Sequence, residues 1–145
     1  MIQRIDVHEV LQRQVSGVYA DLVTRPTGRA VREEIERTIA GVEARVTVID
    51  FTHVGCVDYS CADEIVAKLV RDKVTVLLLR GLTDAHREAI EPVLAGAGLA
   101  VLCERADGAL EGLGASEPAP ALLDELVERR LTARNPGGSI RLTAA

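Results

Sequence analysis

The segment Cys56–Leu69, CVDYSCADEIVAKL, concentrates the side chains of this chain that can do chemistry. Two cysteines, a serine, a tyrosine and three carboxylates stand in its first nine residues. Apolar residues then recur at the spacing of an amphipathic helix. The segment is therefore compatible with a catalytic cysteine, a metal site, a regulatory serine or the polar start of a helix.

Helix capping is the structural explanation for the serine. Ser60 and Asp63 have the spacing of a capping box, in which the serine hydroxyl accepts a hydrogen bond from the first turn and the acid accepts one from the serine N–H. Asp63 and Glu64 also suit the positive end of a helix dipole. Capping alone can account for these three residues, and a regulatory role for Ser60 stays open beside it.

Cys61 is the candidate nucleophile, because a thiol in the first turn of a helix can have a lowered pKa. Asp58, Asp63 and Glu64 would oppose this by repelling a thiolate, and only His53 is near enough in sequence to serve as a base. We therefore expect Cys61 to be a small buried residue. We also expect the chain not to be an enzyme, with a cysteine-dependent enzyme as the alternative.

A zinc site would use His53, Cys56 and Cys61, with Asp58 as a fourth ligand. Their H-x2-C-x4-C spacing matches no standard structural zinc site, and there is no second cysteine pair. We expect no metal and no other cofactor.

Composition limits the classes of function. A length of 145 residues with 48% hydrophobic residues fits one globular domain. Aromatic residues make up 2%, which disfavours base-stacking surfaces, and the net charge of −5 disfavours nucleic-acid or anionic-membrane binding. Charges at Arg4, Asp6 and Glu9 interrupt any signal peptide, and the three cysteines lack disulfide spacing. We expect a reduced, cytoplasmic protein.

The order of strand-like and helix-like apolar segments predicts the fold class. Short aliphatic runs over residues 46–51, 74–80 and 99–103 are expected to be strands buried on both faces. Helical patterns that begin near Ala62 and at Asp84 separate them. This order predicts two βαβ units in a small mixed, largely parallel sheet with helices packed on it, an α/β fold.

Other segments give weaker patterns. A helix is expected between Pro26 and Gly41, and residues 2–7 and 20–23 are possible strands. Pro92 should kink or end the helix that starts at Asp84. The two remaining histidines, His8 and His86, are expected to be solvated on the surface.

The C-terminal part changes in composition. Residues 105–121 are rich in glycine and proline and predict a loop or linker. An amphipathic helix is expected over Leu122–Leu131, followed by either a hairpin or a frayed tail. We therefore divide the chain into an α/β domain over residues 1–105 and a linker with a C-terminal segment over residues 106–145.

The central segment resembles a known family. In STAS domains, the fold of bacterial anti-sigma factor antagonists, a hydrophobic strand ends in Asp, a short connector follows, and a helix starts at a serine pair. Asp50 matches the strand end, Asp58 the connector, and Ser60 the second serine, which that family uses as its phosphorylation site. Ser60–Ile65, SCADEI, and Thr24–Glu36 are most similar to a divergent STAS-like family of unknown function. The resemblance covers about residues 20–103.

The resemblance implies a non-enzymatic regulatory module that binds a protein partner through the loop and helix around Ser60. The implied partner is an anti-sigma factor or a serine kinase of the histidine-kinase-like ATPase fold. Two departures are that the first serine is Tyr59 and that the glycine after the second serine is Cys61. The candidate partner-binding residues are Asp50, Thr52, Asp58, Tyr59, Ser60, Cys61, Asp63 and Glu64.

An alternative is a DNA-linked transcriptional regulator. Leu122–Ala144 resembles the last helix and wing of a winged helix, and its arginines would form a basic patch. The preceding helix–turn–helix is missing and the chain is acidic, so a dimerisation arm is the other interpretation of this segment.

Overall fold

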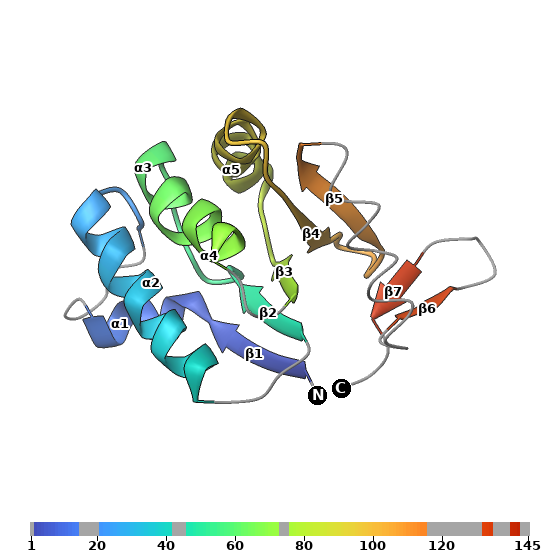
Figure 1. Cartoon of the computed structure of the whole chain (residues 1–145), viewed down its shortest axis with the longest axis horizontal. Helices are drawn as coiled ribbons and strands as arrows, with labels where there is room; N and C mark the ends of the chain where they lie inside the picture. The colour runs from blue at the N-terminus through green and yellow to red at the C-terminus, as the bar shows by residue number, and fades with distance from the viewer. Residues whose placement is uncertain are drawn as a thin grey trace.

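A five-stranded sheet forms the centre of the molecule (Figure 1). The computed structural model describes residues 2–14, 21–41, 46–72, 76–115, 132–134 and 140–142. The strands lie in the order β1-β2-β3-β4-β5; β1 to β4 are parallel, and β5 runs antiparallel to β4. Their bounds are β1 (Ile2–Asp6), β2 (Val46–Asp50), β3 (Val76–Arg80), β4 (Ala100–Glu104) and β5 (Leu110–Gly114). The prediction of a mostly parallel α/β fold with βαβ units is confirmed.

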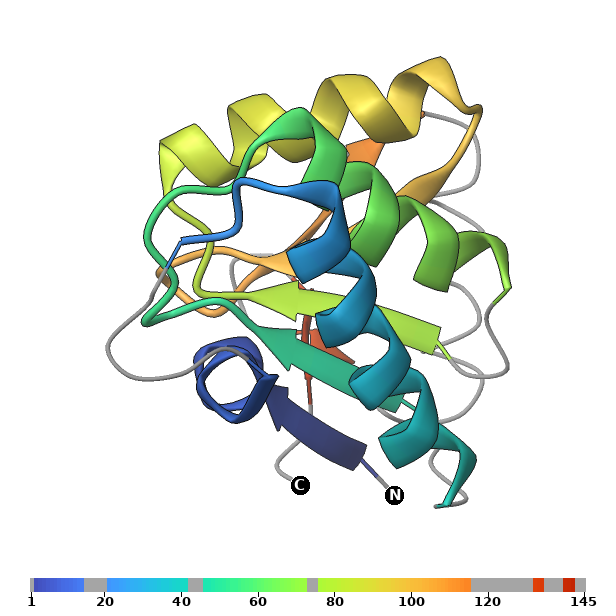
Figure 2. The same ribbon diagram turned by 90° about the vertical axis from the view of Figure 1, so that its left-hand side faces the viewer.

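The helices cover one face of this sheet, as Figure 2 shows. Right-handed crossovers between successive neighbouring strands all leave the sheet on the same side, which explains this arrangement. The helices are α1 (Val7–Gln14), α2 (Arg25–Ala40), α3 (Tyr59–Cys61), the π-helical turn η1 (Ala62–Ala67), α4 (Lys68–Arg71) and α5 (Asp84–Gly96). The segments α3, η1 and α4 form one continuous helix. Among the described residues, no helix is long and apolar enough to cross a bilayer.

Both faces of the sheet are buried. Ile49, Leu79 and Val101 belong to the core that packs against the helices. The alternate residues Val48, Leu78 and Leu102 face the opposite side, and each is 0% exposed. The prediction that these strands are buried on both faces is confirmed.

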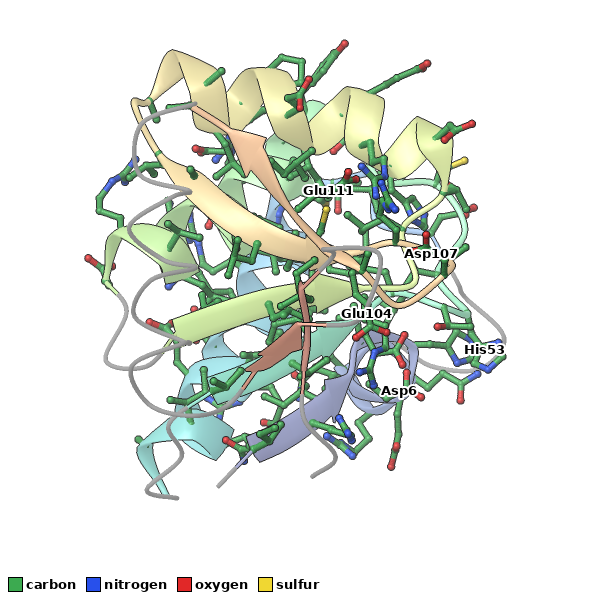
Figure 3. All side chains as sticks on the ribbon, turned by 90° about the vertical axis from the view of Figure 1, so that its right-hand side faces the viewer. Asp6, His53, Glu104, Asp107 and Glu111 are labelled. Atoms are coloured by element: carbon green, nitrogen blue, oxygen red, sulfur yellow. The ribbon has the colours of Figure 1, made fainter. Side chains whose placement is uncertain are left out.

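A short C-terminal hairpin lies on the side of the sheet away from the helices (Figures 1 and 3). Its strands β6 (Thr132–Arg134) and β7 (Ile140–Leu142) are antiparallel, and β7 contacts β5. Of the two predictions for this segment, the hairpin is confirmed. The helix predicted over Leu122–Leu131 lies outside the described residues.

Two predictions about strands are wrong. Residues 110–114, predicted as part of a loop, form β5, which pairs with β4 and buries Leu110 and Leu113. The glycines of this segment led to the loop prediction. Of the segment 20–23 the structure describes residues 21–23, and among these only Leu22 pairs, through an isolated bridge to Val57. The edge-strand prediction for the N-terminus is confirmed by β1, whereas α1 was not predicted.

Helix α5 does not end at Pro92, which was one of the two outcomes expected there, a kink being the other. It begins after Thr83, whose side chain accepts the His86 N–H, and continues to Gly96. Pro92 is exposed, so water can satisfy the carbonyl that lacks a proline N–H partner. Ile90 and Leu94 are fully buried on either side of it and hold the helix on the sheet.

Replacement of Gly114 tests the placement of β5. Gly114 has φ 106°, and a Cβ there would lie 2.5 Å from the Leu99 carbonyl oxygen. We expect Gly114→Ala to lower the free energy of unfolding by more than about 2 kcal/mol, because both the backbone conformation and the contact become unfavourable.

Gly96→Ala is the matched control, since a Cβ at this helical glycine meets no atom within 4 Å. It should be neutral or stabilising by up to about 1 kcal/mol. Urea denaturation followed by circular dichroism measures both changes. Equal stabilities for the two variants would contradict the pairing of β5.

Candidate functional site

The connection between β2 and α3 is held from several sides. Phe51 and Val54 are buried, and the Val54 N–H donates to the Phe51 carbonyl. The Leu22 N–H donates to the Cys56 carbonyl, and the Asp58 N–H donates to the Leu22 carbonyl, at 2.7 and 2.9 Å. These bonds fix the segment before α2 beside the start of α3.

Asp58, rather than Ser60, caps the helix. The Asp58 carboxylate accepts the Cys61 N–H at 3.0 Å, and the Ser60 hydroxyl donates to the same Oδ1 at 2.7 Å. The capping-box prediction for Ser60 and Asp63 is therefore wrong. Aspartate and serine cap helices about equally well, so the residue types did not reveal that the helix begins at Tyr59.

The ionisation of Asp58 reflects these bonds. Partial burial alone would raise the pKa of the Asp58 carboxyl. The hydrogen bonds from Ser60 and Cys61 outweigh this effect and hold its pKa below the usual value. Asp58 therefore carries its negative charge directly beside the Ser60 hydroxyl.

Cys61 is a core residue, as predicted. Its thiol is fully buried and donates to the Thr24 carbonyl at 3.1 Å. Burial and the nearby Asp58 carboxylate raise the pKa of Cys61 to about 11. A Cβ added to Gly28 would lie 3.2 Å from the Cys61 sulfur, so α2 approaches α3 closely at this glycine.

The cysteines considered above as zinc ligands lie in different environments. Cys61 lies inside the core, whereas Cys56 is an exposed thiol. Within the part of the chain that the structure describes, no group of three histidine, cysteine or acidic residues could hold a metal ion.

Glu64 is the centre of an ion cluster and is only 1% exposed. Its carboxylate accepts hydrogen bonds from Arg25 and Lys68, both at 2.8 Å, and from Arg32 at 3.4 Å. Burial alone would raise the pKa of Glu64, but Lys68 and Arg25 lower it to about 2. Asp63 is half-buried and also binds Arg25. These two acids therefore connect η1 to α2.

Asp50 and Thr52 form a separate group at the end of β2. The Asp50 carboxylate accepts the Thr52 N–H at 2.8 Å and also the Thr52 hydroxyl. Gly81, with φ 73°, lies against them, because a Cβ there would be 2.4 Å from the Thr52 hydroxyl oxygen. Among the described residues, no hydrogen bond joins Asp50 or Thr52 to the Asp58–Ser60 group.

The expectation that His86 is solvated is wrong. His86 is buried; its Nδ1 accepts the Thr83 N–H, and its Nε2 lies 2.6 Å from the Gly55 carbonyl oxygen. The ring proton therefore resides on Nε2 and donates to Gly55. His86 thus joins the start of α5 to the connection between β2 and α3. Thr83-x-x-His86 has capping-box spacing, a signal that could have revealed this role.

The expectation for His8 is only partly met. His8 is half-buried, and its ring lies edge-on to the exposed His53 ring, with centroids 5.9 Å apart. This ring contact joins α1 to the loop after β2.

No protein-family model, curated protein or solved structure matches this chain. The resemblance to STAS domains therefore stands on the residues quoted above, and the function must be argued from the site.

Neutralising Glu64 tests the ion cluster. We expect Glu64→Gln to cost about 3 kcal/mol of unfolding free energy, because three cations lose their buried counter-charge. Asp63→Asn is the matched control and should cost less than about 1 kcal/mol, since its ion pair with Arg25 is partly exposed.

The difference in unfolding free energy between the wild type and Glu64→Gln should depend on pH. The Glu64 pKa falls from 4.5 to about 2 on folding, so the charge stabilises the fold above pH 4.5 and this contribution is lost as the pH falls toward 2. Urea titrations of the wild type and Glu64→Gln across this interval measure it. A stability difference that is independent of pH would contradict the cluster.

Proposed function

We propose that this protein is a regulatory module without catalytic activity that binds a protein partner through the surface formed by Val23, Asp58, Tyr59 and Ser60, called here the α3 surface. The observation that carries the proposal is the exposure of Tyr59. Tyr59 is 64% exposed and Val23 is 39% exposed; they are the large hydrophobic residues exposed in the described part of the chain. Tyrosine is enriched among the residues that dominate protein interfaces.

The backbone supports this surface rigidly. The bridge between Leu22 and Val57 and the Asp58-to-Leu22 hydrogen bond hold Leu22, the chain neighbour of Val23, beside the start of α3, where Tyr59 lies. A pre-ordered surface loses little conformational entropy on binding. Cys61, directly beneath, is buried with a raised pKa, properties of an inert core thiol rather than of a nucleophile.

The partner class follows from the resemblance to STAS domains and from charge. We propose a basic surface on an anti-sigma factor or on a serine kinase of the histidine-kinase-like ATPase fold. The negative charge of Asp58 and the net charge of −5 complement such a surface. By the same resemblance, Ser60 is the phosphoacceptor.

Phosphorylation of Ser60 would have a physical consequence because of where the hydroxyl lies. A phosphate adds about −1.5 to −2 charges and removes the hydroxyl proton that Ser60 donates to Asp58. The phosphate and the Asp58 carboxylate would then repel one another across the helix cap. Phosphorylation would thus alter the α3 surface at the residue beside Tyr59, which suits a switch that releases the partner.

Tyr59→Ser tests the binding surface. We expect wild type immobilised on beads to retain a specific protein from a lysate of the source cells, and Tyr59→Ser to lose at least about tenfold in affinity for that purified protein. Arg71→Ala, an exposed change at the far end of the same helix, is the control and should bind as wild type does. Equal affinities of wild type and Tyr59→Ser would refute the α3 surface.

A double-mutant cycle at Ser60 tests the switch. Ser60→Ala should cost about 1 kcal/mol through the lost hydrogen bond, and Ser60→Asp should cost more because of repulsion by Asp58. In an Asp58→Asn background, the additional cost of Ser60→Asp should disappear. Chemical denaturation of the wild type, the two single variants Ser60→Asp and Asp58→Asn and the double variant gives the coupling energy. A coupling energy of zero would contradict the repulsion between Asp58 and a negative charge at residue 60. Intact-mass analysis of the protein from its source reports any phosphate.

A further inference from the structure

A pocket of about 320 Å³ opens at the carboxyl ends of β3 and β4. This is the edge of a parallel sheet where ligand sites gather. The pocket is lined by Arg80, Gly81, Leu82, Arg87, Glu104, Arg105 and Ala106. The lining comes from the end of β3, the start of α5 and the turn between β4 and β5.

Three arginines converge on this pocket, and acids on the β4–β5 hairpin hold them in place. Glu104 accepts two hydrogen bonds from Arg80, at 3.1 and 2.8 Å. Asp107 accepts two from Arg105, at 3.3 and 2.8 Å, and Glu111 accepts one from Arg87. Figure 3 shows the three acids along the same edge of the sheet.

These pairings leave donors for a ligand. A guanidinium carries five N–H donors, and each carboxylate here uses at most two of them. The three arginines and their three acidic partners have a formal charge of zero together, so the ligand must be recognised by the guanidinium N–H groups that these ion pairs leave over rather than by excess positive charge. Arginines fixed by acidic partners pay less conformational entropy when they bind an anion.

The volume limits the size of the ligand. A pocket of 320 Å³ is near the lower limit for small-molecule sites, about 300–1,000 Å³. It is suited to a metabolite of a few carbon atoms rather than to a peptide or nucleic acid. Phosphate and carboxylate oxygens both match the planar fork of a guanidinium.

We propose that this pocket binds a small organic dianion, either a phosphate monoester or a dicarboxylate, and is a ligand site distinct from the α3 surface. Arg80, Arg87 and Arg105 donate their remaining N–H groups to its anionic oxygens, and Gly81 lets the chain pass close to the ligand without a side chain. The site requires no partner protein, so it can be tested on the isolated chain.

Amide NMR titration of the full chain tests the site, with glycerol 3-phosphate and succinate as the two dianions and acetate as the monoanion, at equal ionic strength. We expect saturable shifts of the Gly81, Leu82 and Ala106 amides with one or both dianions, and the dianion that binds identifies the anionic group. Arg87→Gln and Arg105→Gln should each weaken binding by about tenfold or more.

Arg37→Gln is the matched control, because Arg37 is also an exposed arginine with one acidic partner, Glu34, but lies on α2. It should leave the affinity unchanged. Arg105 is 48% exposed and pairs within its own turn, so Arg105→Gln should keep the fold. Its affinity for the dianion therefore tests the site even if Arg87→Gln does not fold. Failure of both dianions to give saturable shifts, equal binding of acetate, or equal weakening by Arg105→Gln and Arg37→Gln would overturn the site.

Discussion

The order of the strands is the constraint on which the rest of the structure depends. Because each of the first four strands pairs with its successor in the same direction, every right-handed crossover leaves the sheet on the same side. The loops that follow β1, β2 and β3 and the turn after β4 therefore lie side by side along one edge. That edge carries a row of charged residues, Asp6, Asp50, Arg80 and Glu104, each in register with the next strand or bonded to it. The α3 surface and the arginine pocket both derive from this edge.

Close contact between α2 and the helix after β2 determines how the α3 surface is presented. Gly28 allows the two backbones to approach, and the Glu64 cluster supplies electrostatic attraction at the same contact. A buried carboxylate with three cationic partners is costly to form but specific, since few other helix arrangements would satisfy it. The start of α3 is thereby held by packing below it and by ion pairs beside it. Tyr59 can remain exposed because the fold does not need it as a core residue.

The sequence predicts those parts of the fold in which hydrophobic pattern and secondary structure agree. The strands β2, β3 and β4 are continuous aliphatic runs, and α2 carries clear start and stop signals, so their placement was correct. Strand β5 was not predicted because Gly112 and Gly114 lower its strand propensity, while its stability comes from pairing with β4, which the residue types of 110–114 alone do not show. The role of His86 was missed because its partner Gly55 lies on another element, and that of Asp58 because aspartate and serine are about equally good helix caps. At the candidate site, residue types indicated the segment, but not which acid caps the helix and which is buried.

The π-helical turn η1 has a consequence for how this helix can change over evolution. An extra residue inserted into a regular α-helix rotates everything after it by about 100° and would turn the buried Leu69 and Val70 toward solvent. A π-helical turn instead absorbs one residue by widening locally, which leaves the flanking turns in place. Ala62–Ala67 is therefore a position where related chains can differ by one residue in length without loss of the core. An alignment that forces this helix to constant length would misplace either Ser60 or the apolar residues of α4.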